Sequence, residues 1–262
     1  MAAIAAVLAA GVAVTAPRTP TAAQDMQAAD VDTALIVSVD VSNSVDENRY
    51  RLQMEGIAKA LEDESVVNAI AGGAAGGILF SMVTWADRPA VAVPWTRITD
   101  KASAAELAAK IRKLPQQGGE FTCMTKMLRS VNDKIVPQIP GKPGRIVVDV
   151  SGDGPDNCNA DEPIDKVRDE LVASGVTVNG LPILVEPEPG KEQMPLPGAG
   201  GLSVEEWYRA HVMAGPGAFV LPAQGYSDFG RAIRQKFIVE ISGITPAQRY
   251  SERSLVGTEG LE

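Results

Sequence analysis

The sequence is poor in the side chains that carry most nitrogen- and sulfur-based chemistry. It has one histidine, two cysteines and 5% aromatic residues in a chain of 262. Apart from residues 2–16 it contains no long apolar run, so we expect no membrane span in the mature chain. A formal net charge of -9 opposes binding to nucleic acid or to anionic membranes. A hydrophobic content of 45% with 22% charged residues is typical of a folded globular protein.

Common enzyme signatures are also missing. There is no Gly-x-Ser-x-Gly elbow of a serine hydrolase, and residues 71–77 (AGGAAGG) lack the Gly-Lys-Ser/Thr of a phosphate-binding loop. The single His211 lies in YRAHVMAGPG, where we expect a packing or surface role rather than catalysis. An Asp-x-Asp phosphatase would need a carboxylate where Ser42 stands. We therefore predict that the protein is not an enzyme.

Residues 1–24 resemble a signal peptide. The apolar run from Ala2 to Ala16 is followed by a Pro/Thr/Ala segment with small residues at Thr21 and Ala23. No Lys or Arg precedes the run, which suggests that the true start of a longer signal lies upstream. A short N-terminal helix or a lipid anchor is the alternative. We predict export, to the periplasm or beyond the cell.

Strand-like and helical patterns alternate along the rest of the chain. This alternation predicts one α/β domain over residues 32–243, with a polar tail at 244–262. The expected architecture is a doubly wound, mostly parallel sheet with helices on both faces and one antiparallel edge strand. Ser44 with Glu47 predicts a capping box for the first helix, and Ser103 predicts a second helix start. We expect strands at 33–39, 78–85, 90–95, 145–150, 176–184 and 218–221, and helices at 50–61, 103–114, 122–136, 161–174, 203–213 and 227–240.

Oxygen-bearing side chains gather where the two core strands end. The first strand leads into Asp40-x-Ser42-x-Ser44, the second into Ser151-Gly152-Asp153, and a Gly-Gly loop leads to Thr122. Doubly wound folds place binding sites at the carboxyl ends of their strands. Hydroxyls and carboxylates suit Mg²⁺, which prefers octahedral oxygen coordination and keeps several waters. Each residue alone is also explained as a helix cap or turn residue, but their joint occurrence favours a metal site.

The pattern resembles the metal-ion-dependent adhesion site (MIDAS) of von Willebrand factor A domains. The stretches VDVSGDGPDN, GVTVNGLPIL, GPGAFV and FGRAIRQKFIVEISG are similar to a bacterial family of exported A-domain-like proteins of uncharacterised function. The resemblance, which extends over residues 32–243, implies a Rossmann-like fold. It also implies Ser42, Ser44 and Thr122 as direct ligands of Mg²⁺ (or Mn²⁺ or Ca²⁺), with Asp40 and Asp153 acting through water. The open metal position would take a Glu or Asp carboxylate from a partner protein.

The loop around Thr122 departs from the usual pattern. It reads GGEFTCMTKML, so Thr125 is a second candidate ligand, and Phe121 and Met124 are bulkier than the small residues usual there. If the resemblance holds, Cys123 and Cys158 lie on the same rim of the crevice, where a disulfide would join the Thr loop to the Asp loop. Two free thiols are the alternative.

These observations predict an exported, metal-dependent protein-binding module. Two other functions stay open. The chain could be a metal-independent structural or assembly module, or, with only the oxygen ligand set in its favour, a metal-dependent hydrolase.

Overall fold

A five-stranded sheet forms the centre of the molecule. The computed structural model describes residues 30–158, 161–186, 196 and 198–243. The strand order is β3-β2-β1-β4-β5, with β3 antiparallel to β2 and every other pair parallel. This confirms the doubly wound sheet with an antiparallel edge strand. The strands are β1 (Val31–Asp40), β2 (Ile78–Trp85), β3 (Pro89–Ile98), β4 (Pro143–Gly152) and β5 (Val176–Pro182).

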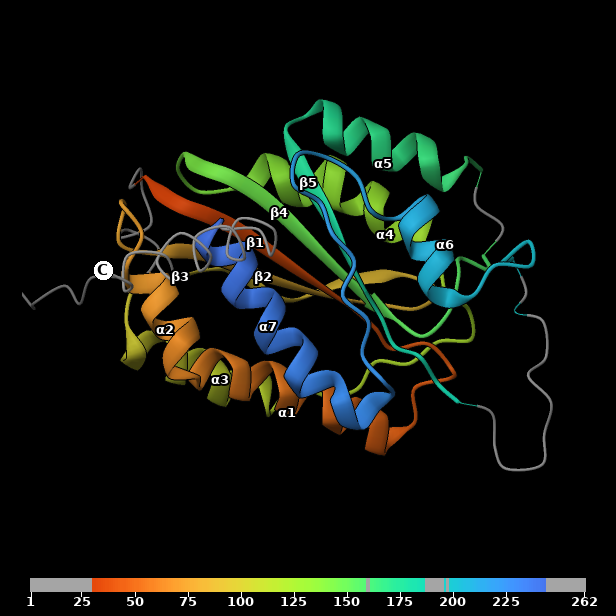
Figure 1. Ribbon diagram of the computed structural model, residues 1–262, viewed down its shortest axis with the longest axis horizontal. Helices are drawn as coiled ribbons and strands as arrows, with labels where there is room; N and C mark the ends of the chain where they lie inside the picture. Colours follow the sequence, from red (N-terminus) through yellow and green to blue (C-terminus); the bar gives the residue numbers. More distant parts are fainter. Residues whose placement is uncertain (1–29, 159–160, 187–195, 197, 244–262) are drawn as a thin grey trace, which may run out of the picture.

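Helices cover both faces of this sheet. In the described part of the chain, α1, α2, α3 and α7 lie on one face and α4, α5 and α6 on the other (Figure 1). Among the described residues, two short helices of other types, η1 and η2, follow α4, and a third, η3, precedes α7. The helices are α1 (Glu47–Glu62), α2 (Glu64–Ala71), α3 (Lys101–Ile111), α4 (Met124–Ser130), η1 (Val131–Ile135), η2 (Val136–Gln138), α5 (Ile164–Ala173), α6 (Val204–His211), η3 (Tyr226–Asp228) and α7 (Phe229–Ser242).

The central strand β1 explains why the sheet is buried on both sides. Its side chains alternate between the faces, so Leu35 and Val37 enter the core under α1 and α7 while Ile36 enters the core under α4 and α5. All three are fully buried. Burial of such a side chain contributes about 1.5–3 kcal/mol, and an uninterrupted apolar run is the pattern expected of a parallel strand covered on both faces.

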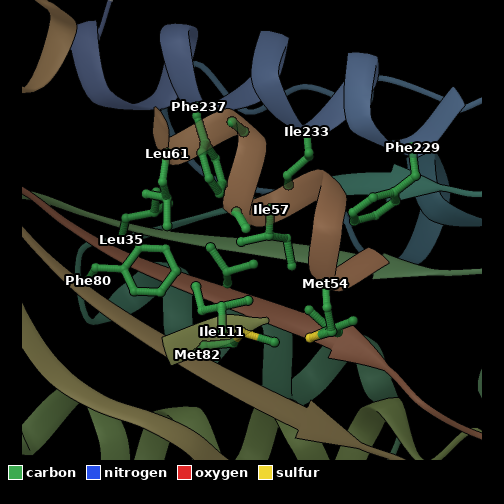
Figure 2. Close-up of a cluster of buried hydrophobic side chains, with 14 of the residues drawn as sticks. Leu35, Met54, Ile57, Leu61, Phe80, Met82, Ile111, Phe229, Ile233 and Phe237 are labelled. Atoms are coloured by element: carbon green, nitrogen blue, oxygen red, sulfur yellow. The ribbon is translucent and has the colours of Figure 1, made fainter. Parts of the chain in front are cut away.

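The larger core lies between the sheet and the α1–α7 pair (Figure 2). Phe80 of β2 meets Phe237 of α7 edge to face, with ring centroids 6.3 Å apart. The two helices approach closely at Gly56, where a Cβ atom would lie 2.9 Å from the Phe229 ring and 3.1 Å from the Gly230 Cα. A larger residue at Gly56 would therefore push α1 and α7 apart.

The two predicted serine caps are wrong. Asp46 caps α1 by accepting the Arg49 N–H at 2.8 Å, because the Ser44 hydroxyl is used elsewhere, as described below. Asp100 caps α3, and Ser103 is the third residue of that helix in a reciprocal capping box. In both helices a carboxylate near the first turn is the better acceptor for the free N–H groups.

Two predicted elements differ in extent. The helix expected at 122–136 begins at Met124 and passes into π- and 3-10-type turns, where Pro137 has no N–H to continue an α-helix. The strand expected at 218–221 is reduced to a bridge between Gly180 and Val220. There the Asn179 side chain, rather than a strand carbonyl, accepts the Phe219 N–H at 2.9 Å, so a regular ladder does not form.

Some predictions fall outside the described residues. These are the signal peptide at 1–24, the tail at 244–262 and most of the Pro/Gly-rich stretch at 186–201. No helix in the described ranges combines the length and the apolar character that crossing a bilayer would require.

Candidate metal centre

The predicted ligands lie at one end of the two central strands. Strands β1 and β4 are parallel neighbours, with Val39 opposite Ser151, so their carboxyl ends meet at the same edge. Asp40 is the last residue of β1, and Asp153 directly follows β4. Thr122 comes from the loop before α4. The fold thus brings together residues more than a hundred positions apart.

Three hydroxyl groups converge around Ser42. The Ser42 Oγ lies 3.4 Å from the Ser44 Oγ, and the Thr122 Oγ1 lies 3.3 Å from the Ser42 Oγ. Ser44 also donates a hydrogen bond to Asp153 Oδ1 at 2.7 Å. That bond joins the loop after β1 to the loop after β4, and it occupies the hydroxyl that was expected to cap α1.

Asp40 forms the floor of this cluster. Its Oδ1 accepts the Ser42 N–H at 2.8 Å, which fixes the turn. Its Oδ2 is buried and has no hydrogen-bond partner among the described residues. Burial, with a smaller effect from the Asp153 carboxylate, raises the pKa of Asp40 from 3.8 to about 7. No positive charge among the described residues contributes to this shift, so an ionised Asp40 would lack a compensating cation there.

These residues fit a hard divalent cation. The described residues contain no group of three or more His, Cys, Asp or Glu side chains that could hold a metal, so any site here must use hydroxyl ligands. Ser42, Ser44 and Thr122 supply these hydroxyls. The Asp40 Oδ2 atom, which has no hydrogen-bond partner among the described residues, would be stabilised by a nearby positive charge. Mg²⁺ and related ions accept such oxygen donors together with water.

Tyr226 and Arg49 also belong to the site, although neither residue lies in a recognisable sequence motif. The Tyr226 hydroxyl donates to Asp153 Oδ2 at 3.0 Å. The Arg49 Nη1 lies 4.0 Å from the same oxygen and donates to the Ser44 carbonyl at 2.5 Å. The guanidinium also stacks over the Tyr226 ring at 5.1 Å. Together they hold the Asp153 carboxylate and place one positive charge at the rim.

Gly152 is required by the close packing beneath Asp40. A Cβ atom there would lie 2.8 Å from the Tyr208 hydroxyl and 2.9 Å from Asp40 Oδ2. The Tyr208 hydroxyl is buried and also lacks a hydrogen-bond partner among the described residues. Burial and the nearby Asp40 carboxylate raise the pKa of Tyr208 well above its ordinary value, so this hydroxyl stays neutral.

The loop that carries Thr122 is tied to the loop after β4. Cys123 and Cys158 form a disulfide with Cα atoms 4.8 Å apart, as the resemblance implied. Beside it, the Thr122 N–H donates to Asn157 Oδ1 at 2.8 Å and the Asn157 N–H donates to the Thr122 carbonyl at 3.1 Å. The position of Thr122 therefore depends on the loop after β4.

The alternative ligand Thr125 is not part of the hydroxyl cluster. Its hydroxyl and backbone N–H both bond to Asp156. The two bulky residues of the loop face opposite ways, since Met124 is fully buried and Phe121 is 49% exposed. Phe121 is accommodated because its side chain leaves the core, while its N–H donates to Asp87 Oδ1 at 2.7 Å.

Comparison with known protein families shows which family the chain belongs to. The sequence profile of a family described as "Protein of unknown function (DUF1194)" matches residues 30–245. The chain belongs to the DUF1194 family. Among curated proteins, none matches this DUF1194 sequence.

Solved structures give the fold of this DUF1194 protein. Proximal thread matrix protein 1 from the mussel byssus is similar over 82% of this chain and 49% of its own, with 18% identity and a TM-score of 0.58. A von Willebrand factor type A protein from Catenulispora acidiphila is similar over 80% and 43%, with 15% identity and a TM-score of 0.55. The pilus adhesin SpaC from Lactobacillus rhamnosus GG is similar over 81% and 31%, with 13% identity and a TM-score of 0.56.

The shared fold is that of a von Willebrand factor A domain, as the sequence motifs predicted. The DUF1194 chain spans about half or less of the length of these proteins. One structure of the mussel protein is described with a zinc-occupied MIDAS motif.

Proposed function

We propose that this DUF1194 protein is an exported binding module that uses a divalent cation to hold a partner protein. Ser42, Ser44 and Thr122 would contact the ion directly, with Asp40 and Asp153 holding its water ligands. The observation that supports this proposal most directly is the convergence of the three hydroxyls beside Asp40, whose Oδ2 is buried without a hydrogen-bond partner among the described residues. We propose Mg²⁺ as the ion, with Mn²⁺ or Ca²⁺ as the alternatives.

The donor set explains why the partner would supply a carboxylate. When bound, the ion acts as a Lewis acid. Because the hydroxyl ligands are neutral, they leave most of its positive charge uncompensated. An incoming Glu or Asp side chain provides the missing negative charge. Arg49, which is half-buried at the rim beside Asp153, adds to the attraction for an acidic group. Exposed Phe121, next to Thr122, offers an apolar contact beside it.

Two further observations support this proposal. The names of two structurally similar proteins describe an adhesin and a thread matrix protein, and a metal-occupied MIDAS motif is described for the second of them. The Cys123–Cys158 disulfide is typical of oxidising compartments such as the periplasm or the extracellular space, which supports export.

Calorimetric titration with Mg²⁺ and Mn²⁺ tests the metal site. We expect saturable binding to the wild type and none to the Ser42→Ala or Thr122→Ala variants. Ser151→Ala is the matched control, because the Ser151 hydroxyl bonds to the Ser38 carbonyl at 3.2 Å rather than to the cluster, and it should bind like the wild type. Absence of binding by the wild type would refute metal dependence.

One observation favours a second candidate, a metal-independent structural or assembly module. The Ser44–Asp153 hydrogen bond and the Arg49 guanidinium already satisfy Asp153 without a metal ion. Capture of exported proteins on immobilised protein, with and without chelator, separates the two candidates. Retention that survives chelator and the Thr122→Ala change would support the metal-independent module.

No observation favours a hydrolase. The only histidine, His211, lies on α6 with its Nδ1 3.1 Å from both Asp165 oxygens and its ring 5.2 Å from Trp207. That pairing supports a surface packing role and leaves the metal centre without an imidazole base.

A further inference from the structure

A second group of buried polar residues lies between the sheet and α7. It consists of Asp149 in the middle of β4 with Lys236 and Glu240 on α7, and we refer to it as the buried charge cluster. Lys236 and Asp149 have no exposed surface, and Glu240 is 3% exposed. Fully buried lysine is rare in proteins because an ammonium loses its hydration. The cluster plays no part in the metal centre.

The amine of Lys236 lies against both carboxyl groups. Its Nζ is 3.5 Å from Asp149 Oδ1 and 2.9 Å from Glu240 Oε1, and it sits 4.3 Å from the centre of the Phe219 ring. Among the described residues, neither Asp149 oxygen has a partner with hydrogen-bond geometry, and the Lys236 Nζ has none either. Asn179 donates to Glu240 Oε1 at 2.8 Å and so orients that carboxylate.

The charges in the cluster do not balance if every group is ionised, because one ammonium faces two carboxylates. Burial, with a further effect from Glu240, raises the pKa of Asp149 well above its ordinary value. Burial thus favours the neutral carboxylic acid form of Asp149. The cluster thus contains the Lys236 amino group, the Asp149 carboxyl group 3.5 Å from it, and a second carboxylate, Glu240, that can accept a proton.

We propose that Lys236 and Asp149 condense to form an intramolecular isopeptide bond between α7 and β4. Glu240 takes one proton from the Lys236 ammonium, and the resulting amine attacks Cγ of Asp149. The new C–N bond forms as the C–O bond to the acid hydroxyl breaks. That hydroxyl leaves with a second amine proton as one molecule of water. The products are a secondary amide, water and protonated Glu240, so atoms and charge balance without a further reagent.

The surroundings favour this step in a way that water does not. In water the amine and the acid ionise and do not condense, whereas burial disfavours both charged forms. The Lys236 ammonium and the Glu240 carboxylate are costly to bury, and the reaction replaces both with neutral groups. Phe219 covers the amine on one side, which keeps bulk water away from the new bond.

Mass spectrometry of the protein, purified from its exported form and then reduced and alkylated, tests the bond directly. We expect an intact mass one water molecule lower than the mass calculated for the purified polypeptide with two alkylated cysteines. Trypsin should fail to cut after Lys236, and a cross-linked peptide should join residues 146–166 to 235–249. An unmodified mass with normal cleavage at Lys236 overturns the proposal. A link from Lys236 to Asn179, with loss of ammonia, or to Glu240 overturns the assignment of Asp149.

Two variants test the roles of the residues without relying on Asp149. Lys236→Met keeps an unbranched side chain of similar length and should show the mass calculated for its own purified, alkylated polypeptide, with no loss of water. Glu240→Gln keeps the shape of the proton acceptor and should lose the cross-link while its circular dichroism stays that of the wild type. Asp228→Asn is the matched control, since Asp228 pairs with Arg231 outside the cluster, and it should remain cross-linked. Full cross-linking in Glu240→Gln overturns the role of Glu240 as proton acceptor.

Discussion

The disulfide between Cys123 and Cys158 allows a quantitative prediction about stability. The two cysteines are 35 residues apart, and closing a loop of that size in the unfolded chain removes entropy worth about 4 kcal/mol at room temperature. Two hydrogen bonds between Thr122 and Asn157, one to the Asn157 side chain and one between backbones, also hold these loops together in the folded protein. Removing the disulfide should therefore act chiefly through the unfolded state and leave the fold intact.

The Cys123→Ala/Cys158→Ala double variant tests this reasoning by urea unfolding. With a slope of about 3 kcal/mol per molar urea, a loss of about 4 kcal/mol lowers the midpoint by about 1 M. Wild-type protein unfolded in the presence of reductant should show the same shift. An unchanged midpoint, with the disulfide verified in the wild type by mass, would refute the entropic estimate.

The same variant should also bind metal more weakly. Cys123 follows Thr122 directly, so losing the disulfide removes one support of that ligand. Loss of a supporting group typically weakens metal affinity by about tenfold or more, and calorimetry with Mn²⁺ would measure it. An unchanged affinity would show that the Thr122–Asn157 bonds alone hold the loop.

Three further predictions concern the floor and the rim of the site. Gly152→Ala puts a methyl group 2.8 Å from the Tyr208 hydroxyl, so urea unfolding should show a loss of about 1–3 kcal/mol; an unchanged midpoint contradicts the tight packing. Because the pKa of Asp40 rises from 3.8 to about 7 on folding, the folded state binds more protons, and metal-free stability should fall as the pH rises through that window. Thermal melts in chelator check this, and Asp40→Asn should flatten the dependence. Arg49→Ala removes a positive charge beside Asp153 and should strengthen Mg²⁺ binding by about 1 kcal/mol, or about fivefold, in calorimetry; weaker binding would show that Arg49 positions Asp153.

Much of the fold could be predicted from hydrophobic patterns. The apolar runs of β1 and β4 identify strands buried on both faces, and the Asp87–Pro89 turn identifies the antiparallel pair. The ends of helices were harder, because several polar residues near each start compete for the same N–H groups. At α1 the competition was settled by a contact with Asp153, which is distant in sequence.

The candidate site was predictable where its residues follow strands. Asp40 ends β1, Ser42 follows two residues later, and Asp153 directly follows β4. Because these two strands must end at the same edge, the proximity of the three residues follows from the topology. Tyr226 and Arg49 come from η3 and α1 and reach Asp153 only through the packing of α1 against the C-terminal region. No local pattern in the sequence marks such long-range contacts.

The buried charge cluster did leave a trace in the sequence. Asp149 interrupts the apolar strand RIVVDV, and Lys236 and Glu240 stand four residues apart in a helix rich in buried apolar residues. A charged residue in a two-sided core strand needs a partner from the covering helix. Finding that partner required knowing that α7, and not another helix, packs on β4.

The position of β1 at the centre of the sheet has a consequence for the order in which the protein folds. Strand β1 pairs with β2, as in Thr33 with Ile78, and with the more distant β4, as in Thr33 with Arg145. Closing such distant contacts makes folding slow. Cys123 and Cys158 are 35 residues apart, which is closer along the chain than either of these strand contacts, so closing the loop between them costs less entropy. In an oxidising compartment, the loop that carries Thr122 can thus be fastened before the sheet beneath it is complete.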